Sequence, residues 1–414
     1  VFGAKPSTIW PTTSLDTCEV PCRISDDKSS LLQSDAVIFH GRDMPETMPT
    51  RRTTNQRWIV INTVLMLTAS FATFYILTVV IPLLRGILTL ADTSQKRKVI
   101  LFYTTVFGAK PSTIWPTTSL DACEVPCRIS DDKSSLLQSD AVIFHGRDMP
   151  ETMPTRRTTN QRWVYFIQEN PHYTSPEPLK YNGMFNWTMT YKRSSDVWAP
   201  YGTYRTPLAL PLFLLTERDF AAKKTRLAAW ASSHCSSTGF LREQYVEKLQ
   251  LYIPVDVFGN CNPRGPRCPR GSNMCNALLK KYKFYLAFEN AFCEDYITEK
   301  YWEQALKHDM IPVVMGGANY DELVVPKSYI NVLDFSSVES LACYLKTLDA
   351  NSTAYNEYFY WKKQYEVLST APWCRLCEML HNQSLPNKVY WDLGSFWGVK
   401  ENCMRFSNKI KDQI

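Results

Sequence analysis

The sequence predicts an α/β protein with two parallel-sheet domains facing a cleft, preceded by one membrane-spanning helix. From Lys98 onward, short apolar runs alternate with helical patterns, as expected for parallel strands joined by helices. A Pro- and Leu-rich stretch at 207–215, followed by the charged segment 217–226, marks the boundary between the two domains. Residues 58–84 contain no Asp, Glu, Lys or Arg, and a membrane helix needs only about 20 apolar residues.

Composition and charge restrict the class of protein. The chain has 414 residues, of which 45% are hydrophobic and 21% charged. This length suits two globular domains plus accessory segments, at about 100–200 residues per domain. Lys and Arg (46) slightly exceed Asp and Glu (40), which gives a net charge of +6. The sequence has no Lys- or Arg-rich pattern interleaved with aromatic residues, so we expect no nucleic-acid partner.

The N-terminal segment 1–58 is nearly identical to 106–163, and the one difference is Thr17 against Ala122. Two copies separated by a membrane span cannot share a core as solenoid repeats do. Only the second copy follows an apolar run that predicts a strand and precedes chain with which it can pack. We therefore expect the duplicated segment 1–58 to be disordered and to carry no chemistry.

Residues 59–90 are expected to form a transmembrane anchor, joined to the rest by a short stem at 91–97. A secretory signal peptide is the competing interpretation, but the apolar stretch is too long and too far inside the chain. Three glycosylation sequons follow the span and none precedes it, at Asn186, Asn351 and Asn382. This pattern places the C-terminal part in the lumen, as in a single-pass type II membrane protein.

Apolar and β-branched runs predict buried strands in both domains. They lie at 99–105, 141–144 and 163–167 in the first domain, 98–215, and at 283–288 and 311–315 in the second, 216–370. Residues 296–307 have helical spacing, with Asp295 as a candidate N-cap and Gly316-Gly317 permitting a sharp exit from the next strand. The remainder, 371–414, is a C-terminal cysteine-containing segment.

Several separated motifs resemble those of the α1,3-fucosyltransferase family. The densest match is 284–302, and it continues through 311–317 and 328–331, with an upstream cluster at 185–202. The resemblance covers about residues 98–400 and implies a GT-B type fold, with two Rossmann-like domains facing a cleft. It further implies a Golgi enzyme that moves fucose, with inversion, from GDP-fucose to the 3-hydroxyl of a GlcNAc in glycoprotein N-glycans.

Three residues of the main motif are candidates for the donor site. Tyr296, Glu299 and Lys300 are spaced so that one helical face can carry them all, and the helix N-terminus suits a pyrophosphate. Lys300 would neutralise charge on the departing GDP, while Glu299 would bind sugar hydroxyls or stabilise positive charge at the anomeric carbon. Without the resemblance, a solvated surface pair is the better interpretation.

Two further residues are expected to bind the donor. Asn290 closes the predicted strand 283–288, where the ligand crevice of an α/β domain lies, and would bind phosphate or ribose. Its alternative is a turn-forming Asn. The resemblance assigns Arg242 to the diphosphate, which a guanidinium fork suits, and its alternative is an exposed helix residue.

Glu169 is the candidate general base, because the acceptor hydroxyl must lose its proton as it attacks. It follows the predicted strand 163–167 and resembles the glutamate of the family's Glu-Ser-Pro element, although Asn170 stands here in place of Ser. Taken alone, it would be an ordinary loop glutamate. No Asp-x-Asp pair accompanies these motifs, so we expect no metal or cofactor requirement, and weak stimulation by Mn²⁺ would be compatible.

Cysteine usage favours disulfides. Of the 13 cysteines, all except Cys18 and Cys22 follow the predicted span. Zinc is conceivable at Cys374 and Cys377, but an oxidising lumen and the absence of a matching His/Cys quartet favour disulfides. The odd number leaves a free thiol or an intermolecular bond.

Two functional alternatives stay open. The acceptor is a core or an antennal, Lewis-type GlcNAc, and the cysteine-containing loop 261–275 favours the core-type, invertebrate-like enzymes. A catalytically inactive, membrane-anchored glycan-binding homologue would keep aromatic sugar platforms such as Trp187, Trp198 and Tyr201 without needing Glu169.

Overall fold

The computed structural model describes most of the chain from residue 97 to residue 414, and all described residues belong to one compact unit. Its gaps are 116–119, 122, 175–176, 208–217, 234, 236–241, 266–267, 270, 371 and 404–407. The predicted duplicated segment 1–58, the anchor 59–90 and the stem up to residue 96 lie outside the described residues. Within the described part, no helix combines the length and apolarity that a membrane crossing requires.

Six parallel strands form the first sheet, in the order β2-β1-β3-β4-β5-β6. They are β1 (Lys98–Phe102), β2 (Cys127–Ser130), β3 (Ala141–His145), β4 (Arg162–Ile167), β5 (Trp187–Thr190) and β6 (Val197–Trp198). The central strands β3 and β4 are almost wholly buried, as parallel strands covered on both faces require. The three strands predicted here are confirmed, but β1 ends at Phe102, three residues before the predicted end at residue 105.

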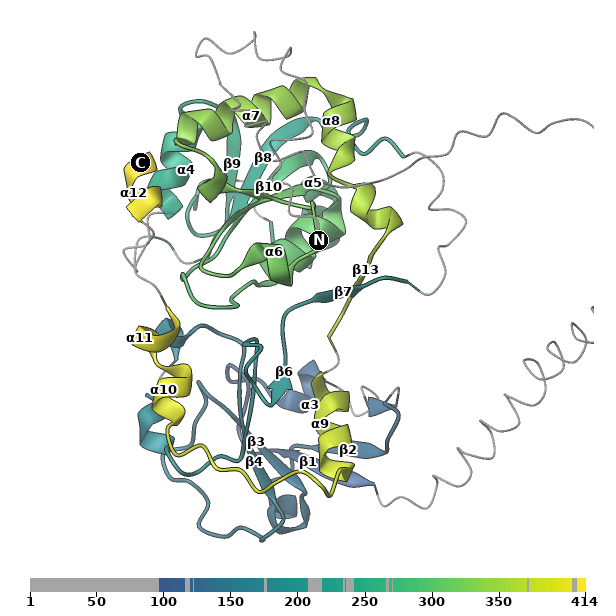
Figure 1. Cartoon of the computed structure of the whole chain (residues 1–414), viewed down its shortest axis with the longest axis vertical. Coiled ribbons are helices and arrows are strands. Elements are labelled where there is room, and N and C mark those ends of the chain that lie inside the picture. Colours follow the sequence, from purple (N-terminus) through teal and green to yellow (C-terminus); the bar gives the residue numbers. More distant parts are fainter. Residues whose placement is uncertain are drawn as a thin grey trace, which may run out of the picture. The chain divides into compact units, whose positions relative to one another are not determined.

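Five parallel strands form the second sheet, in the order β12-β11-β10-β8-β9, of which β8, β9 and β10 are labelled in Figure 1. They are β8 (Arg226–Ala231), β9 (Val255–Phe258), β10 (Tyr282–Phe288), β11 (Ile311–Met315) and β12 (Ile330–Asn331). The predicted strands at 283–288 and 311–315 are confirmed as β10 and β11. Two further short strands, β7 (Thr203–Arg205) and β13 (Glu366–Leu368), pair antiparallel with each other. The structure therefore contains two parallel sheets, as the sequence predicts.

Helices connect and cover these strands. The α-helices are α3 (Pro111–Ile114), α4 (Arg242–Gln250), α5 (Asn273–Leu279), α6 (Tyr320–Leu323), α7 (Val338–Ala350), α8 (Ser352–Glu357), α9 (Pro372–His381), α10 (Leu393–Trp397), α11 (Val399–Asn402) and α12 (Asn408–Gln413). After β10, a π-helical turn spans Lys300–Ala305 and a 3₁₀ turn spans Leu306–His308. Helical turns therefore begin at Lys300, four residues later than the predicted start at Tyr296.

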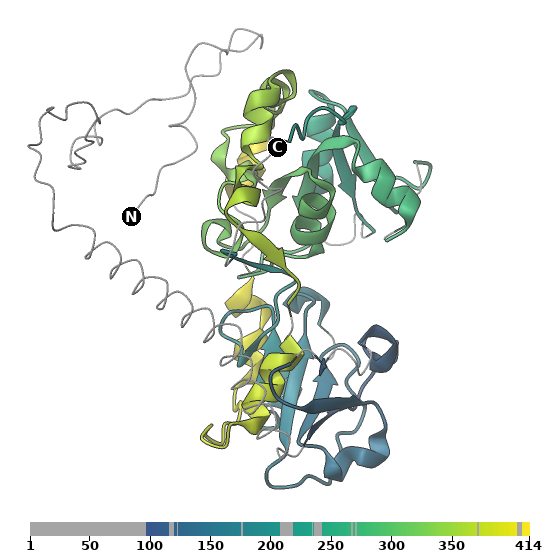
Figure 2. The ribbon, with the colours of Figure 1, turned by 90° about the vertical axis from the view of Figure 1, so that its right-hand side faces the viewer.

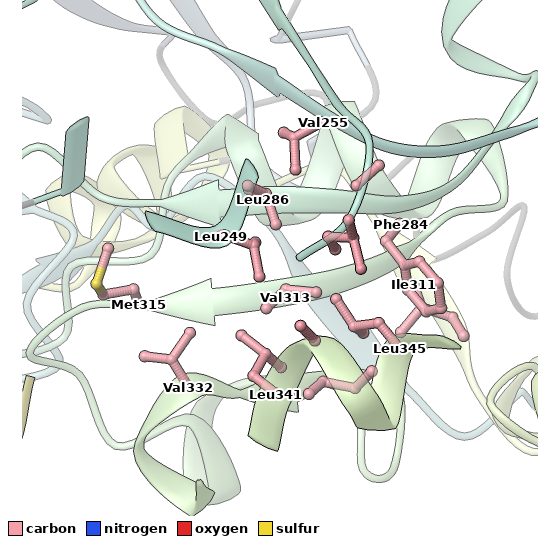
Figure 3. Close-up of a cluster of buried hydrophobic side chains, with 14 of the residues drawn as sticks. Leu249, Val255, Phe284, Leu286, Ile311, Val313, Met315, Val332, Leu341 and Leu345 are labelled. Carbon is pink, nitrogen blue, oxygen red and sulfur yellow. The ribbon is translucent and has the colours of Figure 1, made fainter. Parts of the chain in front are cut away.

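The core of the second sheet shows why the strands and α7 form together. The buried α7 residues Leu341 and Leu345 are four positions apart on one helical face, and they pack toward Phe284 and Val313 (Figure 3). Ser337 caps the helix by accepting the Ser340 backbone N–H, in a reciprocal capping box. Burial of this apolar stripe against β10 and β11 fixes the sheet whose carboxyl edge carries the candidate site.

The C-terminal segment returns to both sheets. Trp373 and Leu376 of α9 belong to the core of the first sheet, and the yellow ribbon of α9 lies beside the blue strands in Figure 2. Ile410 of α12 is buried in the core of the second sheet. Both sheets therefore depend on the last 40 or so residues for part of their packing.

Five disulfides join described cysteines: Cys123–Cys374, Cys127–Cys377, Cys235–Cys261, Cys268–Cys275 and Cys293–Cys403. The expectation of disulfides over zinc at Cys374 and Cys377 is confirmed. Both bonds anchor α9 to the chain just before β2, across sequence separations of 251 and 250 residues.

Candidate active site

The candidate site lies where parallel strands end. In the second sheet, β9 and β10 lie on opposite sides of β8, so the strand order reverses at β8. In open α/β sheets, ligands bind at the carboxyl ends of the strands beside such a reversal. Glu289 and Asn290 directly follow β10. Glu169 follows β4 of the first sheet by two residues. Both predicted clusters therefore sit at carboxyl edges.

Glu169 accepts several hydrogen bonds through one oxygen. Its Oε1 lies 2.8 Å from the Tyr296 hydroxyl, 3.1 Å from the Asn170 backbone N and 3.0 Å from Asn170 Nδ2. Burial raises the pKa of Tyr296 well above its usual range, with further contributions from Tyr201 and Glu169. Tyr296 therefore stays protonated and donates. The structure brings Glu169 and Tyr296 together, although 127 residues separate them in sequence.

Asn170 occupies the place of the family's serine and does more than cap a turn. Its Oδ1 accepts the backbone N–H of His172, which begins the 3₁₀ turn Pro171–Tyr173. Its Nδ2 donates both to Glu169 and, at 3.1 Å, to Oδ1 of Asn290. The predicted site residue Asn290 is buried and lies beside the predicted base, held by a side-chain amide pair.

The segment before the helix differs from the prediction. Asp295 has a left-handed backbone with φ of 57°, and its carboxylate accepts the backbone N–H of Arg193 at 2.9 Å. It is therefore not the N-cap. Tyr296 lies outside the helix, so the prediction that Tyr296, Glu299 and Lys300 share one helical face is wrong. Tyr296 instead contacts Glu169, whereas Glu299 lies beside Lys300 after the chain has turned at Asp295.

Lys300 is held in a buried ion pair. Its Nζ lies 2.8 Å from Oε2 of Glu289, 2.8 Å from the Thr298 hydroxyl and 4.0 Å from Oε1 of Glu299. Burial opposes the ammonium form, but the charges of Glu289 and Glu299 outweigh it and raise the pKa of Lys300. Lys300 is therefore a cation at neutral pH.

A carboxylate already occupies the N-terminus of the helical turn that begins at Lys300. Oε1 of Glu289 accepts the backbone N–H of Thr298 at 2.8 Å and its hydroxyl at 3.0 Å. Burial raises the pKa of the Glu289 carboxyl, while the Lys300 charge acts against this shift. The expectation that the backbone N–H groups of 295–300 serve a pyrophosphate is therefore wrong for Thr298. A carboxylate from the end of β10 occupies that position instead.

Arg242 begins α4 and is almost fully buried, with only 2% of its surface exposed. Its guanidinium lies over the Trp230 ring at 5.9 Å, and its Nε is 3.6 Å from a Glu243 oxygen. Its charge also acts on Lys300, in the direction of a lower Lys300 pKa. Arg242 is therefore a buried cation close enough to Lys300 to interact electrostatically, and it is not an exposed helix residue.

The carboxylates of the site all affect the pKa of the Tyr201 hydroxyl. Burial raises the pKa of Tyr201 well above its usual range, and the charges of Glu299, Glu169 and Glu289 add to the shift. The Tyr201 hydroxyl donates to the backbone oxygen of Gln168 at 2.9 Å. The predicted acidic residues Glu169 and Glu299 therefore both raise the pKa of one partly buried side chain, while Glu169 is hydrogen-bonded to Tyr296 and Glu299 lies beside Lys300.

Sequence reasoning missed three participants. Glu289 and Thr298 were not singled out, although an acidic residue at the end of a buried strand is a signal in itself, since buried carboxylates must be paired. His145 ends β3, and its Nδ1 lies 2.5 Å from Oδ2 of Asp148. Burial lowers the pKa of His145, with Asp148 and Glu169 acting in the opposite direction. His145 is thus a third polar group near the carboxyl edge of the first sheet.

Two His/Cys clusters have metal-ligand proximity among the described residues: Cys127, Cys377 and His381, and His172, Cys293 and Cys403. Both pairs of cysteines form disulfides, so their sulfurs are not thiolate ligands. A cavity of about 470 Å³ lies elsewhere, lined by Lys224, Ile253 and Lys346 among others. It opens where β8 and β9 begin, at the edge of the sheet opposite to Glu289.

Known proteins resemble this chain over most of its described length. The family "Fucosyltransferase, N-terminal" matches residues 95–202, and "Glycosyltransferase family 10 (fucosyltransferase) C-term" matches residues 221–396. Alpha-(1,3)-fucosyltransferase C of Drosophila melanogaster is 34% identical over 350 residues, which covers 77% of this chain and 81% of the relative. Glycoprotein 3-alpha-L-fucosyltransferase A of the same species is 35% identical, over 66% of this chain and 54% of its own length.

A vertebrate relative and a solved structure are also similar. A 3-galactosyl-N-acetylglucosaminide 4-alpha-L-fucosyltransferase of Bos taurus is 35% identical over 68% of this chain and 76% of its own length. A crystal structure described as an alpha1,3-fucosyltransferase with GDP-fucose has a TM-score of 0.46 and 17% identity, and the match covers 70% of this chain and 93% of that one.

Proposed function

The chain belongs to the fucosyltransferases of glycosyltransferase family 10, and from that premise we propose that it transfers fucose from GDP-fucose to a glycan. The acceptor is the 3-hydroxyl of a GlcNAc in a glycoprotein N-glycan, and transfer inverts the anomeric carbon. The observation that carries this proposal is the hydrogen bond from Tyr296 to Glu169. It joins a carboxylate at the end of β4 to the segment that leads into Lys300.

The proposed reaction assigns one step to each cluster. Glu169 removes the proton as the acceptor oxygen bonds to the anomeric carbon of fucose and the bond to GDP breaks. The Lys300 ammonium and the Arg242 guanidinium stabilise the negative charge on the departing diphosphate, while Glu299 binds fucose hydroxyls or the positive charge on the sugar ring. Asn290 and Tyr296 bind the donor beside them.

The two buried cations support a reaction that needs no metal ion or cofactor. Lys300 is protonated at neutral pH, and Arg242 carries a permanent charge near it. Together they supply the positive charge that a divalent ion provides in other nucleotide-sugar transferases. Treatment with EDTA should leave turnover nearly unchanged, and added Mn²⁺ should stimulate it only weakly.

We further propose that catalysis takes place in the Golgi lumen, with the protein anchored as a single-pass type II membrane protein through residues 59–90. Five disulfides among the described residues suit an oxidising compartment. The sequon residues Asn351 and Asn382 are exposed, as glycosylation requires, whereas Asn186 is buried and its amide donates to the backbone oxygen of Lys388. Within the glycan, we favour the core GlcNAc over an antennal one, on the cysteine-containing loop 261–275.

The test is transfer by the full chain. The purified protein is incubated with GDP-fucose and defined N-glycans that offer core or antennal GlcNAc, and products are analysed by mass spectrometry and NMR. We expect an α1,3-linked fucose. The Lys300→Ala variant should bind GDP-fucose at least about tenfold more weakly, as loss of a charge-assisted contact predicts, with the exposed Lys307→Ala as matched control. Binding without turnover on any acceptor would favour the inactive glycan-binding homologue.

A further inference from the structure

A buried carboxylate of the site has no role in the proposed chemistry. Glu289 is only 1% exposed and follows directly on β10. Its Oε1 accepts the Thr298 backbone N–H, and its Oε2 lies 2.8 Å from Lys300 Nζ. The Thr298 hydroxyl contacts both Glu289 oxygens, at 3.0 and 2.9 Å, and also lies 2.8 Å from Lys300 Nζ.

These contacts close a triangle of Glu289, Thr298 and Lys300. Burying a carboxylate costs several kcal/mol unless it is paired, and stability alone rarely demands such a pair, since well-packed apolar residues of the same volume often serve as well. The triangle is anchored at β10 on one side and at the backbone of Thr298 on the other. It therefore fixes where the Lys300 side chain can point.

The geometry leaves part of the ammonium available. An ammonium has three N–H donors, and Glu289 and Thr298 take two directions. Glu299 Oε1, at 4.0 Å, lies beyond hydrogen-bond distance. Among the described residues, only Glu289 and Thr298 accept hydrogen bonds from this ammonium, so its third N–H can meet a ligand oxygen.

We propose that Glu289 and Thr298 are positioning residues that hold the Lys300 ammonium in place to bind the diphosphate of the sugar donor. This inference rests on the proposed function, in which Lys300 binds GDP-fucose. Glu289 itself touches no reacting atom. It acts through Lys300, both by orienting the side chain and by keeping it charged.

The charged groups around Lys300 determine in which direction its pKa should shift when Glu289 is replaced. Three charged groups act on it: Glu289 from the end of β10, Glu299 from its own segment and Arg242 from the start of α4. Burial and Arg242 lower its pKa, and the two carboxylates raise it. Removing the Glu289 charge must therefore lower the pKa of Lys300. The ammonium would then lose its proton at a lower pH.

The test compares Glu289→Gln with the parent in the full chain. Gln keeps the shape and can still accept from Thr298, but it removes the charge. We expect the KM for GDP-fucose to rise at least about tenfold and GDP itself to bind more weakly, as removal of a charge-assisted hydrogen bond predicts. The alkaline limb of the kcat/KM profile should move to lower pH.

Two further variants separate positioning from folding. Thr298→Val removes the bridging hydroxyl and should raise the KM for GDP-fucose less than Glu289→Gln does. Thr298→Ser keeps a hydroxyl and should have the KM of the parent. The exposed Glu247→Gln on α4 is the matched control for the charge change and should leave both KM and pH profile unchanged. The Thr298 pair decides the question if Glu289→Gln does not fold.

The opposite outcome is equally clear. If Glu289 and Thr298 are merely structural, their variants lower the melting temperature and the active fraction, while the KM for GDP-fucose and the alkaline limb stay where they are in the parent. That result would overturn the positioning role and leave fucosyl transfer intact. If the parent itself neither binds GDP nor transfers fucose, the proposed function fails first, and the two failures are thus distinguishable.

Discussion

At the scale of single residues, the site is set by how its acidic groups are paired. Glu169 is held through one oxygen by Tyr296 and Asn170, which leaves the other oxygen for an acceptor hydroxyl. Glu289 is enclosed by Thr298 and Lys300 and has no access to an acceptor. Two glutamates that follow the carboxyl ends of β4 and β10 thus take different roles, because Glu169 is only partly buried and Glu289 is fully buried.

The first prediction concerns the hydrogen bond to the candidate base. In Tyr296→Phe, Glu169 loses one of its three hydrogen bonds and is held by Asn170 alone, so kcat should fall about tenfold to a hundredfold, as misplacement of a catalytic group by about 1 Å predicts. Steady-state kinetics of the purified variant measures it. Tyr360→Phe, at an exposed tyrosine, is the control and should match the parent. A normal kcat in Tyr296→Phe would mean that this bond does not orient Glu169.

At the scale of elements, the sequence predicts the central strands and misses the start of the helix. Strands β3, β4, β10 and β11 are continuous apolar runs, and burial on both faces makes such runs recognisable. The helix begins late because Asp295 is left-handed and Glu289 takes the Thr298 N–H. Helical periodicity reveals neither the left-handed backbone of Asp295 nor the hydrogen bond from Thr298 to Glu289, so it could not place the start of the helix.

The glycine pair after β11 gives a prediction at this scale. A Cβ on Gly317 would lie 2.5 Å from the backbone carbon of Phe292, so Gly317→Ala must displace the chain that leads to Asp295. The free energy of unfolding should fall by about 1–3 kcal/mol, as overpacking predicts, and GDP-fucose should bind more weakly. Thermal unfolding and calorimetric titration measure the two effects. An unchanged melting temperature would show that the backbone relaxes without cost.

At the scale of the whole molecule, the two parallel sheets can be predicted from the sequence, but the long-range disulfides and side-chain hydrogen bonds cannot. The parallel sheets could be predicted from the alternation of apolar runs and helical patterns, whereas the predicted domain boundary near 216 lies outside the described residues. The disulfides Cys123–Cys374, Cys127–Cys377 and Cys293–Cys403 and the pairing of Glu169 with Tyr296 could not be, because they join residues more than 100 positions apart. The residue types at the site were recognisable from family motifs, whereas the contacts among them needed the fold.

The disulfide Cys293–Cys403 gives the prediction for the whole molecule. It ties the segment before Asp295 to the C-terminal segment across a separation of 110 residues, whereas Cys268–Cys275 spans only 7. Replacing both cysteines of the long bond by Ala should destabilise the fold by about 2–5 kcal/mol, since the stabilisation grows with loop length. Replacing Cys268 and Cys275 is the control and should cost less. Denaturant unfolding compares them, and an equal loss in both double variants would contradict the loop-length argument.

The central claim is that Glu169 removes the acceptor proton while a separate cluster binds the donor. Its most direct test measures GDP-fucose binding and fucosyl turnover side by side in Glu169→Gln, which keeps the side-chain shape and the acceptor for Tyr296, with the exposed Glu151→Gln as control. We predict that turnover falls by about 10²-fold or more, as loss of a general base implies, while the dissociation constant of GDP-fucose stays within about threefold. Turnover equal to that of the parent would contradict the account.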